Sequence, residues 1–101
     1  MNPTKVDRKR LRRLTDLPNI GPSIACDLQL LGVTCADDLI GRDPYAMYDE
    51  LNAATNVRHD PCIIDVFISI TRFMGGESPR PWWAYTAERK ERLASEDRSS
   101  S

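Results

Sequence analysis

A chain of 101 residues, with 41% hydrophobic and 29% charged residues, has the composition of one soluble globular domain and is too short for two. Three cysteines, an odd number, argue against a disulfide framework, and no apolar stretch follows the basic N-terminus as it would in a signal peptide. No apolar run approaches the roughly 20 residues of a membrane helix. These features exclude a membrane-spanning protein and predict a cytoplasmic one with reduced thiols.

Charge is unevenly distributed along the chain. Residues 1–13 carry six cations and one acid, a net charge of +5, whereas residues 14–80 carry ten acids and four arginines, a net charge of −6. The remaining residues are neutral overall. A basic end on an acidic body is typical of a segment that meets an anionic partner, although a solvated first helix would give the same pattern.

Proline, glycine and capping residues predict an all-α fold, a compact bundle of five or six short helices. No segment alternates polar and apolar residues as a strand would. The first helix is expected over Asp7–Thr15, with its arginines directed away from the core. After a tight turn at Leu17–Gly21, the second helix begins at Pro22, and we expect Gly32 to end it in the left-handed conformation. The inward residues of these two helices are Leu11, Leu14, Ile24, Leu28 and Leu31.

The next helices have recognisable starts. Thr34 is the expected N-cap of the third, with Asp37 in the capping-box position. Asp-Pro pairs at Asp43 and Asp60 open the fourth and the fifth. The inward residues of the fourth helix are expected to be Tyr45, Met47, Tyr48, Leu51 and Ala54. The sixth begins at Trp82; residues 1–94 form the single domain, and residues 95–101 are predicted to be a disordered tail.

The fifth helix, Pro61–Met74, is apolar almost all round. Only Asp65, Ser69 and Arg72 form a thin polar stripe, which we expect to face water. Such a helix should be the buried centre of the domain. Phe67 is therefore predicted to be buried and to contact both halves of the chain.

The segment Leu14–Leu39 carries the most specific pattern. A hydrophobic-glycine turn stands at Ile20-Gly21, Ala25 lies four residues beyond the glycine, and an aliphatic-Gly-aliphatic end follows at Leu31-Gly32-Val33. This pattern resembles a helix-hairpin-helix motif. The longer pattern is similar to the bacterial "pathogenicity locus" proteins, often labelled mitomycin resistance proteins, and to the C-terminal domain of TfoX-type competence regulators. The similarity to the first group continues through the next two stretches, His59–Phe67 and Pro81-Trp82-Trp83.

The turn has a physical interpretation of its own. Gly21 offers a position without Cβ, which we expect backbone geometry to require, and Asn19 tolerates the left-handed conformation. Ile20 can fill the gap between the two helices. The turn exposes the N-terminus of the second helix, where unpaired N–H groups and the helix dipole favour an anion. The resemblance implies that this anion is a DNA phosphate, contacted without reading bases.

The predicted DNA-contacting residues combine the basic segment with the turn. They are Arg8, Arg12, Arg13, Asn19, Gly21, Ser23 and Ile24. The sequence departs from a strong DNA-binding hairpin, because Asn19 replaces the first turn glycine and Pro22 removes an amide donor. In addition, Ser23 and Asp27 stand where such a protein would often have Lys or Arg. A hairpin that only joins two helices therefore stays an alternative.

Other groupings of reactive residues are less persuasive. Cys26, Cys35, His59 and Cys62 could supply three thiols and one imidazole, but their spacings do not match a zinc site, so we expect no metal and no cofactor. A nucleophile formed by Cys62 and His59 is physically conceivable. The simpler expectation is that His59 is a surface residue near a helix start and that Cys62 packs inward. We therefore predict that the protein is not an enzyme.

Trp82 and Trp83 are adjacent near the end of the domain. Because neighbouring positions differ by about 100° around a helix, one ring should cover the core and the other should lie at the surface. The first predicted function is sequence-independent DNA binding, accessory to DNA repair, uptake or recombination. The alternative is a protein–protein interaction adaptor, in which the hairpin is scaffolding and the tryptophans meet a protein partner.

Overall fold

The computed structural model describes the backbone of residues 13–99 and the side chains of residues 13–95. Its elements are helical, with no strand in this part of the chain, so the all-α prediction is confirmed. Four are α-helices and three are short 3-10 helices. In chain order they are η3 (Leu14–Asp16), α1 (Pro22–Leu30), η4 (Ala36–Leu39), α2 (Pro44–Thr55), α3 (Cys62–Met74), η5 (Trp82–Tyr85) and α4 (Thr86–Ser99).

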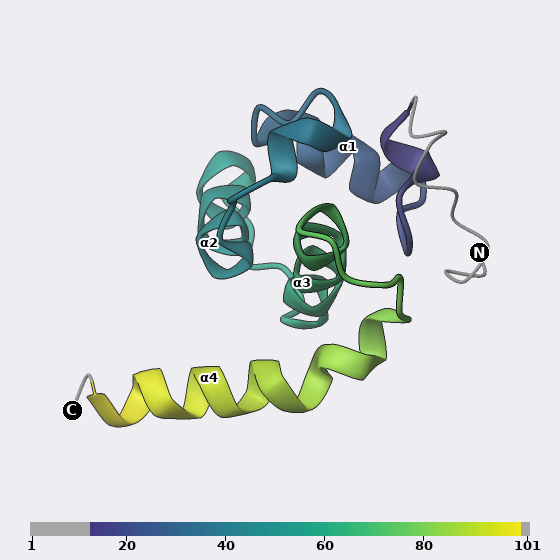
Figure 1. Ribbon diagram of the computed structural model, residues 1–101. Helices are drawn as coiled ribbons and strands as arrows, with labels where there is room; N and C mark the ends of the chain where they lie inside the picture. Colours follow the sequence, from purple (N-terminus) through teal and green to yellow (C-terminus); the bar gives the residue numbers. More distant parts are fainter. Residues whose placement is uncertain (1–12, 100–101) are drawn as a thin grey trace.

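Helix α3 is the centre of the molecule. Figure 1 shows it between α1, α2 and α4, and it contacts α2, η4, η5 and α4. Every residue from Ile64 to Ile70 is buried, and Phe67 has 0% of its surface exposed. The predicted burial of Phe67 is confirmed. A helix that is apolar on nearly every side is stable only when other elements cover it, as they do here.

The polar stripe of α3 is also buried, contrary to expectation. Asp65 and Ser69 are enclosed, and Arg72 is half-buried. The prediction that these residues face water was wrong for Asp65 and Ser69, because η5 and α4 return across this side of α3 and α4 supplies polar partners to Asp65, whereas Arg72 keeps 40% of its side chain exposed. Helical periodicity shows which residues share a face of α3, but it does not show that a later segment of the chain covers that face.

The ends of α1 agree with the sequence pattern. Pro22 occupies the first helical position, and Gly32, directly after the C-cap Leu31, has φ +82°. The left-handed glycine lets the chain reverse, and the amide of Val33 donates to the carbonyl of Leu28 at 3.0 Å. Leu28 is fully buried, whereas its flanking apolar residues Ile24 and Leu31 pack partly against the core.

The caps of η4 and α2 correct one prediction and confirm another. At η4 the capping carboxylate is Asp38 rather than Asp37, since Asp38 accepts from the Thr34 amide and hydroxyl, each at 3.0 Å. At α2, Asp43 Oδ1 accepts from the Tyr45 amide at 2.9 Å, as an N-cap should. Ala54, expected to face inward, is exposed on the solvent side of α2.

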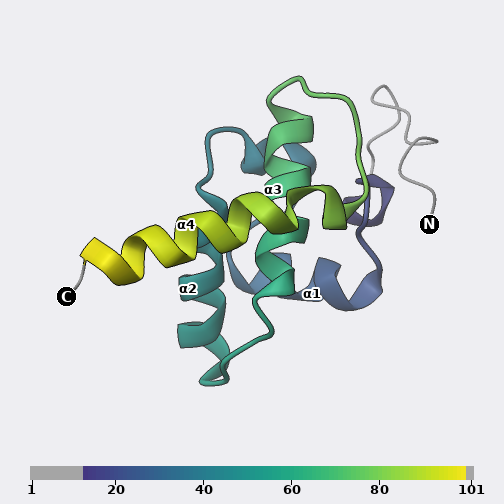
Figure 2. The same ribbon diagram turned by 90° about the horizontal axis from the view of Figure 1, so that it is seen from below.

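Helix α4 lies on the side of α3 opposite α1 and crosses α3 obliquely (Figures 1 and 2). It continues to Ser99, beyond the expected end of the domain at residue 94, and its last part projects past α2 (Figure 2). The helix predicted over Asp7–Thr15 lies largely outside the described residues, which begin with Arg13 and η3. Among the described helices, none has the length and apolar content required to span a bilayer.

Candidate nucleic-acid interface

The turn between η3 and α1 is held by its apolar residues. Leu17 and Ile20 have almost no exposed surface, and Pro18 is also buried between them. Asn19 has φ +65°, so the residue expected to tolerate the left-handed conformation adopts it. An asparagine adopts this conformation more readily than most residues, which explains how the chain turns here without a glycine.

The Asn19 side chain fixes the turn to two distant parts of the chain. Its Nδ2 donates to Ser69 Oγ at 3.1 Å and to the Arg80 carbonyl at 2.8 Å. Ser69 Oγ in turn donates to the Val66 carbonyl at 2.6 Å. Asn19 therefore connects the turn to α3 and to the segment before η5. Its amide nitrogen is thus engaged within the protein. The role of Asn19 in DNA contact stays a prediction.

Gly21 does not have the backbone conformation that was expected. Its φ and ψ are −96° and 179°, an extended conformation open to any residue, and a Cβ built there would have no atom within 4 Å. The prediction that backbone geometry requires glycine at this position was wrong. The left-handed position lies two residues earlier, at Asn19, because that is where the chain reverses. Gly21 is instead the N-cap of α1.

The N-terminus of α1 is open to solvent. Gly21, Pro22 and Ser23 are exposed, no side chain caps this end, and its first turn contains no acid. The first backbone hydrogen bond runs from the Ala25 amide to the Gly21 carbonyl at 3.0 Å. The amides of Ser23 and Ile24 precede that bond, and Pro22 has none to offer. Two amide donors and the positive end of the helix dipole thus meet at one exposed point.

Arg13 lies beside α1. It is exposed, and its backbone amide donates to Asp16 Oδ2 at 2.9 Å, which fixes the start of η3. An open depression of about 450 Å3 between η3 and α1 is lined by Arg13, Pro22 and Gln29 among others. Of the predicted DNA-contacting arginines, Arg13 is thereby brought next to the start of α1. Arg8 and Arg12 lie outside the described residues.

The two tryptophans divide their roles as predicted. Trp82 is half-buried against the core, whereas Trp83 has 63% of its surface exposed. Their rings meet edge to face, with centroids 5.6 Å apart and an interplanar angle of 84°. The segment before them passes beside the turn between η3 and α1 (Figure 1), where the Arg80 carbonyl accepts from Asn19. The exposed ring follows this segment, on an element adjacent to the turn.

Comparison with known proteins identifies the family. The family model described as Pathogenicity locus (Cdd1) matches residues 7–91. The chain belongs to the pathogenicity locus family. Among curated proteins it is similar to "Mitomycin resistance protein McrB" of Streptomyces lavendulae, at 42% identity over 83 residues, which cover 82% of this chain and 79% of the relative. No solved structure matches.

The stretch His59–Cys62, noted in the sequence, has a structural explanation in this pathogenicity locus protein. The His59 carbonyl accepts from the Tyr48 hydroxyl, its amide donates to Asn52 Oδ1 at 2.9 Å, and its Nε2 lies 2.9 Å from Thr55 Oγ1. Asp60 Oδ1 accepts from the amide of Cys62, the first residue of α3, at 2.8 Å. The stretch binds the loop to α2 and starts the central helix.

The cysteines are positioned differently from one another. Cys26 and Cys35 are exposed, whereas Cys62 is half-buried, as predicted for that residue. A hydrogen bond with the Asp60 carboxylate, helped by burial, raises the pKa of the Cys62 thiol above its ordinary value, which is the reverse of an activated nucleophile. Within the described part of the chain, no three His, Cys, Asp or Glu side chains are grouped to hold a metal ion.

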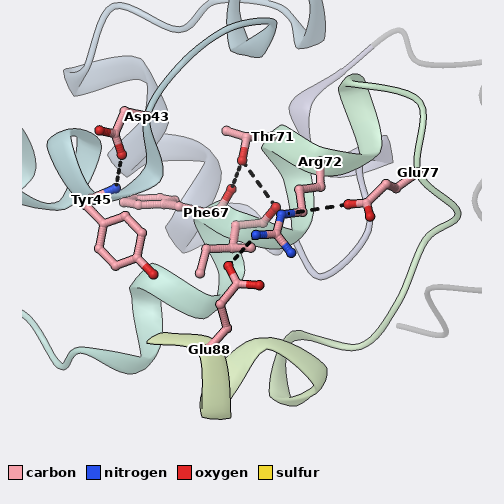
Figure 3. A network of polar contacts seen from close by, with 8 residues as sticks. Asp43, Tyr45, Phe67, Thr71, Arg72, Glu77 and Glu88 are labelled. Atoms are coloured by element: carbon pink, nitrogen blue, oxygen red, sulfur yellow. Dashed lines mark hydrogen bonds and ion pairs between the residues drawn. The ribbon is translucent and has the colours of Figure 1, made fainter. Parts of the chain in front are cut away.

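A second polar region, missed by sequence reasoning, lies between the start of α2, the end of α3 and α4 (Figure 3). Arg72 pairs with Glu88 of α4 and, at 3.8 Å, with Glu77. Nearby, the Arg92 guanidinium lies 4.6 Å from the centroid of the Tyr45 ring. An open cleft of about 730 Å3 borders these residues. The cleft is lined by three arginines and three acids, so it presents no surface of a single charge. They are Arg42, Arg72, Arg92, Asp43, Glu77 and Glu88.

Proposed function

We propose that this pathogenicity locus protein is a non-enzymatic module that binds DNA without sequence specificity. In this proposal, the turn and α1 form the second half of a helix-hairpin-helix that contacts the phosphate backbone, in a role accessory to DNA repair, uptake or recombination. The relative named for mitomycin resistance bears a name that specifies no chemistry, so the proposal rests on the residues of this chain.

The observation that supports the proposal most is the open N-terminus of α1. It offers the backbone amides of Ser23, which is exposed, and of Ile24, which is half-buried. Its first turn contains no acid. A phosphate placed here would accept two amide hydrogen bonds and would experience the positive end of the helix dipole. Because backbone amides recognise phosphate oxygens rather than base edges, binding of this kind would be independent of sequence.

Charge around α1 favours an approach from one side. Residues 1–13 carry a net charge of +5, and the body that follows is acidic. Arg13, the last residue of this basic segment, lines the depression beside Pro22. DNA would therefore be attracted to the edge that contains α1 and repelled elsewhere. In the proposed complex, Arg8, Arg12 and Arg13 neutralise phosphates next to the one held by α1.

A protein–protein adaptor is the second candidate, and two observations favour it. The turn is used structurally, since Asn19 is bonded to Ser69 and Arg80, and the exposed Trp83 is a side chain of the type that anchors protein interfaces. In this alternative, the hairpin is scaffolding and a partner covers Trp83.

The deciding experiment changes charge at the start of α1 without weakening the helix. Ser23→Asp places an acid in the first turn, which stabilises a helix by about 0.3–1 kcal/mol but repels phosphate. A unit charge about 4 Å away costs roughly 1 kcal/mol in water, so duplex affinity should fall about five-fold or more. Ala46→Asp is the matched control, because Ala46 is exposed in the first turn of α2.

Duplex affinity would be measured by fluorescence anisotropy over a series of salt concentrations. The proposal predicts salt-sensitive binding by the natural sequence, weaker binding by Ser23→Asp and unchanged binding by Ala46→Asp. Equal loss in both variants would mean that only net charge matters. Absence of salt-sensitive binding by the natural sequence would contradict DNA binding and favour the adaptor.

A further inference from the structure

Trp83 is exposed, and its ring is supported on one side by another ring. Its ring meets the edge of Trp82, and Trp82 packs against the core. In a 3-10 helix, successive residues are separated by about 120°, so the burial of Trp82 turns Trp83 outward. The preceding residues Pro79 and Pro81 restrict the backbone that enters η5. A large flat ring is thus presented to solvent on a rigid support, which lowers the entropic cost of binding to it.

The exposed ring lies within reach of the start of α1. The hydrogen bond from Asn19 Nδ2 to the Arg80 carbonyl, 2.8 Å long, joins the two segments. Gly21 lies two positions after Asn19, and Trp83 lies three positions after Arg80, which allows at most about 7 Å and 11 Å of chain. Both features therefore lie well within one turn of a DNA duplex, about 34 Å. A single DNA molecule could contact both.

The cation that precedes Trp83 most closely in the sequence, Arg80, indicates the kind of ligand. Arg80 is exposed, and in the described part of the chain it forms no ion pair with an acid. An exposed aromatic ring together with cations that are not ion-paired is the combination that binds single-stranded nucleic acid: the cations attract the backbone and the ring stacks on a base. Bases inside a duplex are already stacked, so only an unpaired base can use the ring.

We infer that Trp83 is a stacking platform for an unpaired DNA base, so that the chain prefers DNA in which a duplex adjoins a single-stranded gap, flap or junction. This inference rests on the proposed function, because α1 holds the duplex backbone while Trp83 receives the base. Arg80 contacts the phosphate between them. The substrate class is therefore discontinuous DNA rather than intact duplex.

The test compares a blunt duplex with the same duplex carrying a short central gap, so that the ends are identical. The unpaired strand contains the fluorescent adenine analogue 2-aminopurine, which reports stacking directly. The variants are Trp83→Ala, Trp83→Phe and Val57→Ala. Val57 is a suitable control because its surface is 56% exposed and it lies in the loop between α2 and α3. Circular dichroism and thermal unfolding would verify that each variant is folded.

The natural sequence should bind gapped DNA more tightly than intact duplex and quench the analogue. Trp83→Ala should lower affinity for gapped DNA by about 5-fold to 150-fold, the contribution of stacking one base on an aromatic ring, and leave affinity for intact duplex unchanged. Trp83→Phe should retain part of the preference, and Val57→Ala all of it.

Two results would overturn the inference while leaving the proposed function intact. One is equal affinity of the natural sequence for gapped and intact duplex. The other is an unchanged preference for gapped DNA in a folded Trp83→Ala variant, which would leave Trp83 to a protein partner. Failure to bind either DNA in a salt-dependent manner would instead contradict the proposed function itself.

Discussion

The guanidinium of Arg89 forms an ion pair with the carboxylate of Asp65 inside the protein. Arg89 Nε lies 2.9 Å from Asp65 Oδ1, and Asp65 has 0% of its surface exposed. The Thr86 hydroxyl donates to the other carboxylate oxygen at 2.7 Å. Residues of α4 thereby neutralise and solvate an acid of α3. The interaction joins the last helix to the central one.

Removing one partner of this pair should be more damaging than removing both. Arg89→Leu leaves the Asp65 carboxylate buried without its cation and should cost about 3–5 kcal/mol of unfolding free energy. The double variant Asp65→Leu/Arg89→Leu should cost less than Arg89→Leu alone, because no uncompensated charge remains. Urea unfolding of the single and double variants measures the coupling. Additive losses would show that the pair contributes no interaction of its own.

Phe67 tests the central position of α3. Since its ring is fully buried, Phe67→Ala should lower the free energy of unfolding by about 3–5 kcal/mol. That is a large share of the stability of a small domain, so the variant should be mostly or nearly unfolded. Ala54→Gly, at an exposed position of α2, should cost only about 1 kcal/mol. Thermal unfolding distinguishes these outcomes, and similar midpoints would contradict the assigned role of Phe67.

The turn before α1 gives a prediction opposite to that of the sequence pattern. Gly21→Ala should cost no more than about 1 kcal/mol, because the backbone is extended and the space for a Cβ is empty, and this cost should come from the weaker N-cap that Ala provides. Asn19→Ala should cost about 1–3 kcal/mol, through left-handed strain and the loss of its two side-chain hydrogen bonds. Asn19→Gly removes the bonds without the strain and separates the two contributions. Chemical denaturation of all three variants provides the measurement.

Local signals in the sequence predicted local structure well. Pro22, Gly32 and the Asp43-Pro44 pair mark helix ends through their own backbone preferences, so these features follow from a few adjacent residues. The predicted stripe on α3 failed for a different reason. Whether Asp65 faces water depends on Arg89, 24 residues later, and on where η5 directs α4.

The candidate interface shows the same division. The exposed start of α1 follows from the turn and the proline at the first helical position. By contrast, the bond from Asn19 to Arg80 joins residues 61 positions apart and has no signal in either segment. Gly21 was misjudged because the general pattern of a hairpin assigns the reversal to glycine, whereas here the asparagine takes that conformation. The position of the Asn19 side chain therefore depends on a long-range hydrogen bond that the local sequence pattern does not predict.

The three thiols should differ in reactivity. Cys26 and Cys35 are exposed and should react rapidly with Ellman's reagent in the folded protein. Cys62 should react slowly, because the Asp60 carboxylate and burial raise the pKa of its thiol and so reduce the reactive thiolate at neutral pH. Its labelling rate should rise only at a higher pH than that of an unperturbed cysteine. Asp60→Asn should lower this pH; three equal rates would contradict the assignment.

The basic N-terminal segment should carry most of the affinity for duplex DNA. Residues 1–13 supply six cations to a body that is otherwise acidic, and Arg13 lies beside the open end of α1. Replacing Arg8, Arg12 and Arg13 by Ala should weaken binding and flatten its dependence on salt. The logarithmic slope should change by about 0.9 for each phosphate contact that is lost. A slope change is informative because a general loss of fold would abolish binding at every salt concentration.

Arg58→Ala is the matched control for this prediction, since Arg58 is an exposed arginine in the loop between α2 and α3. It should leave the salt slope unchanged although it also removes a positive charge. Measuring both variants by anisotropy over the same salt series separates local phosphate contact from net charge. If the triple variant remains folded and binds duplex with the slope of the natural sequence, the basic segment is a solvated arm, and α1 with Trp83 must account for any DNA binding.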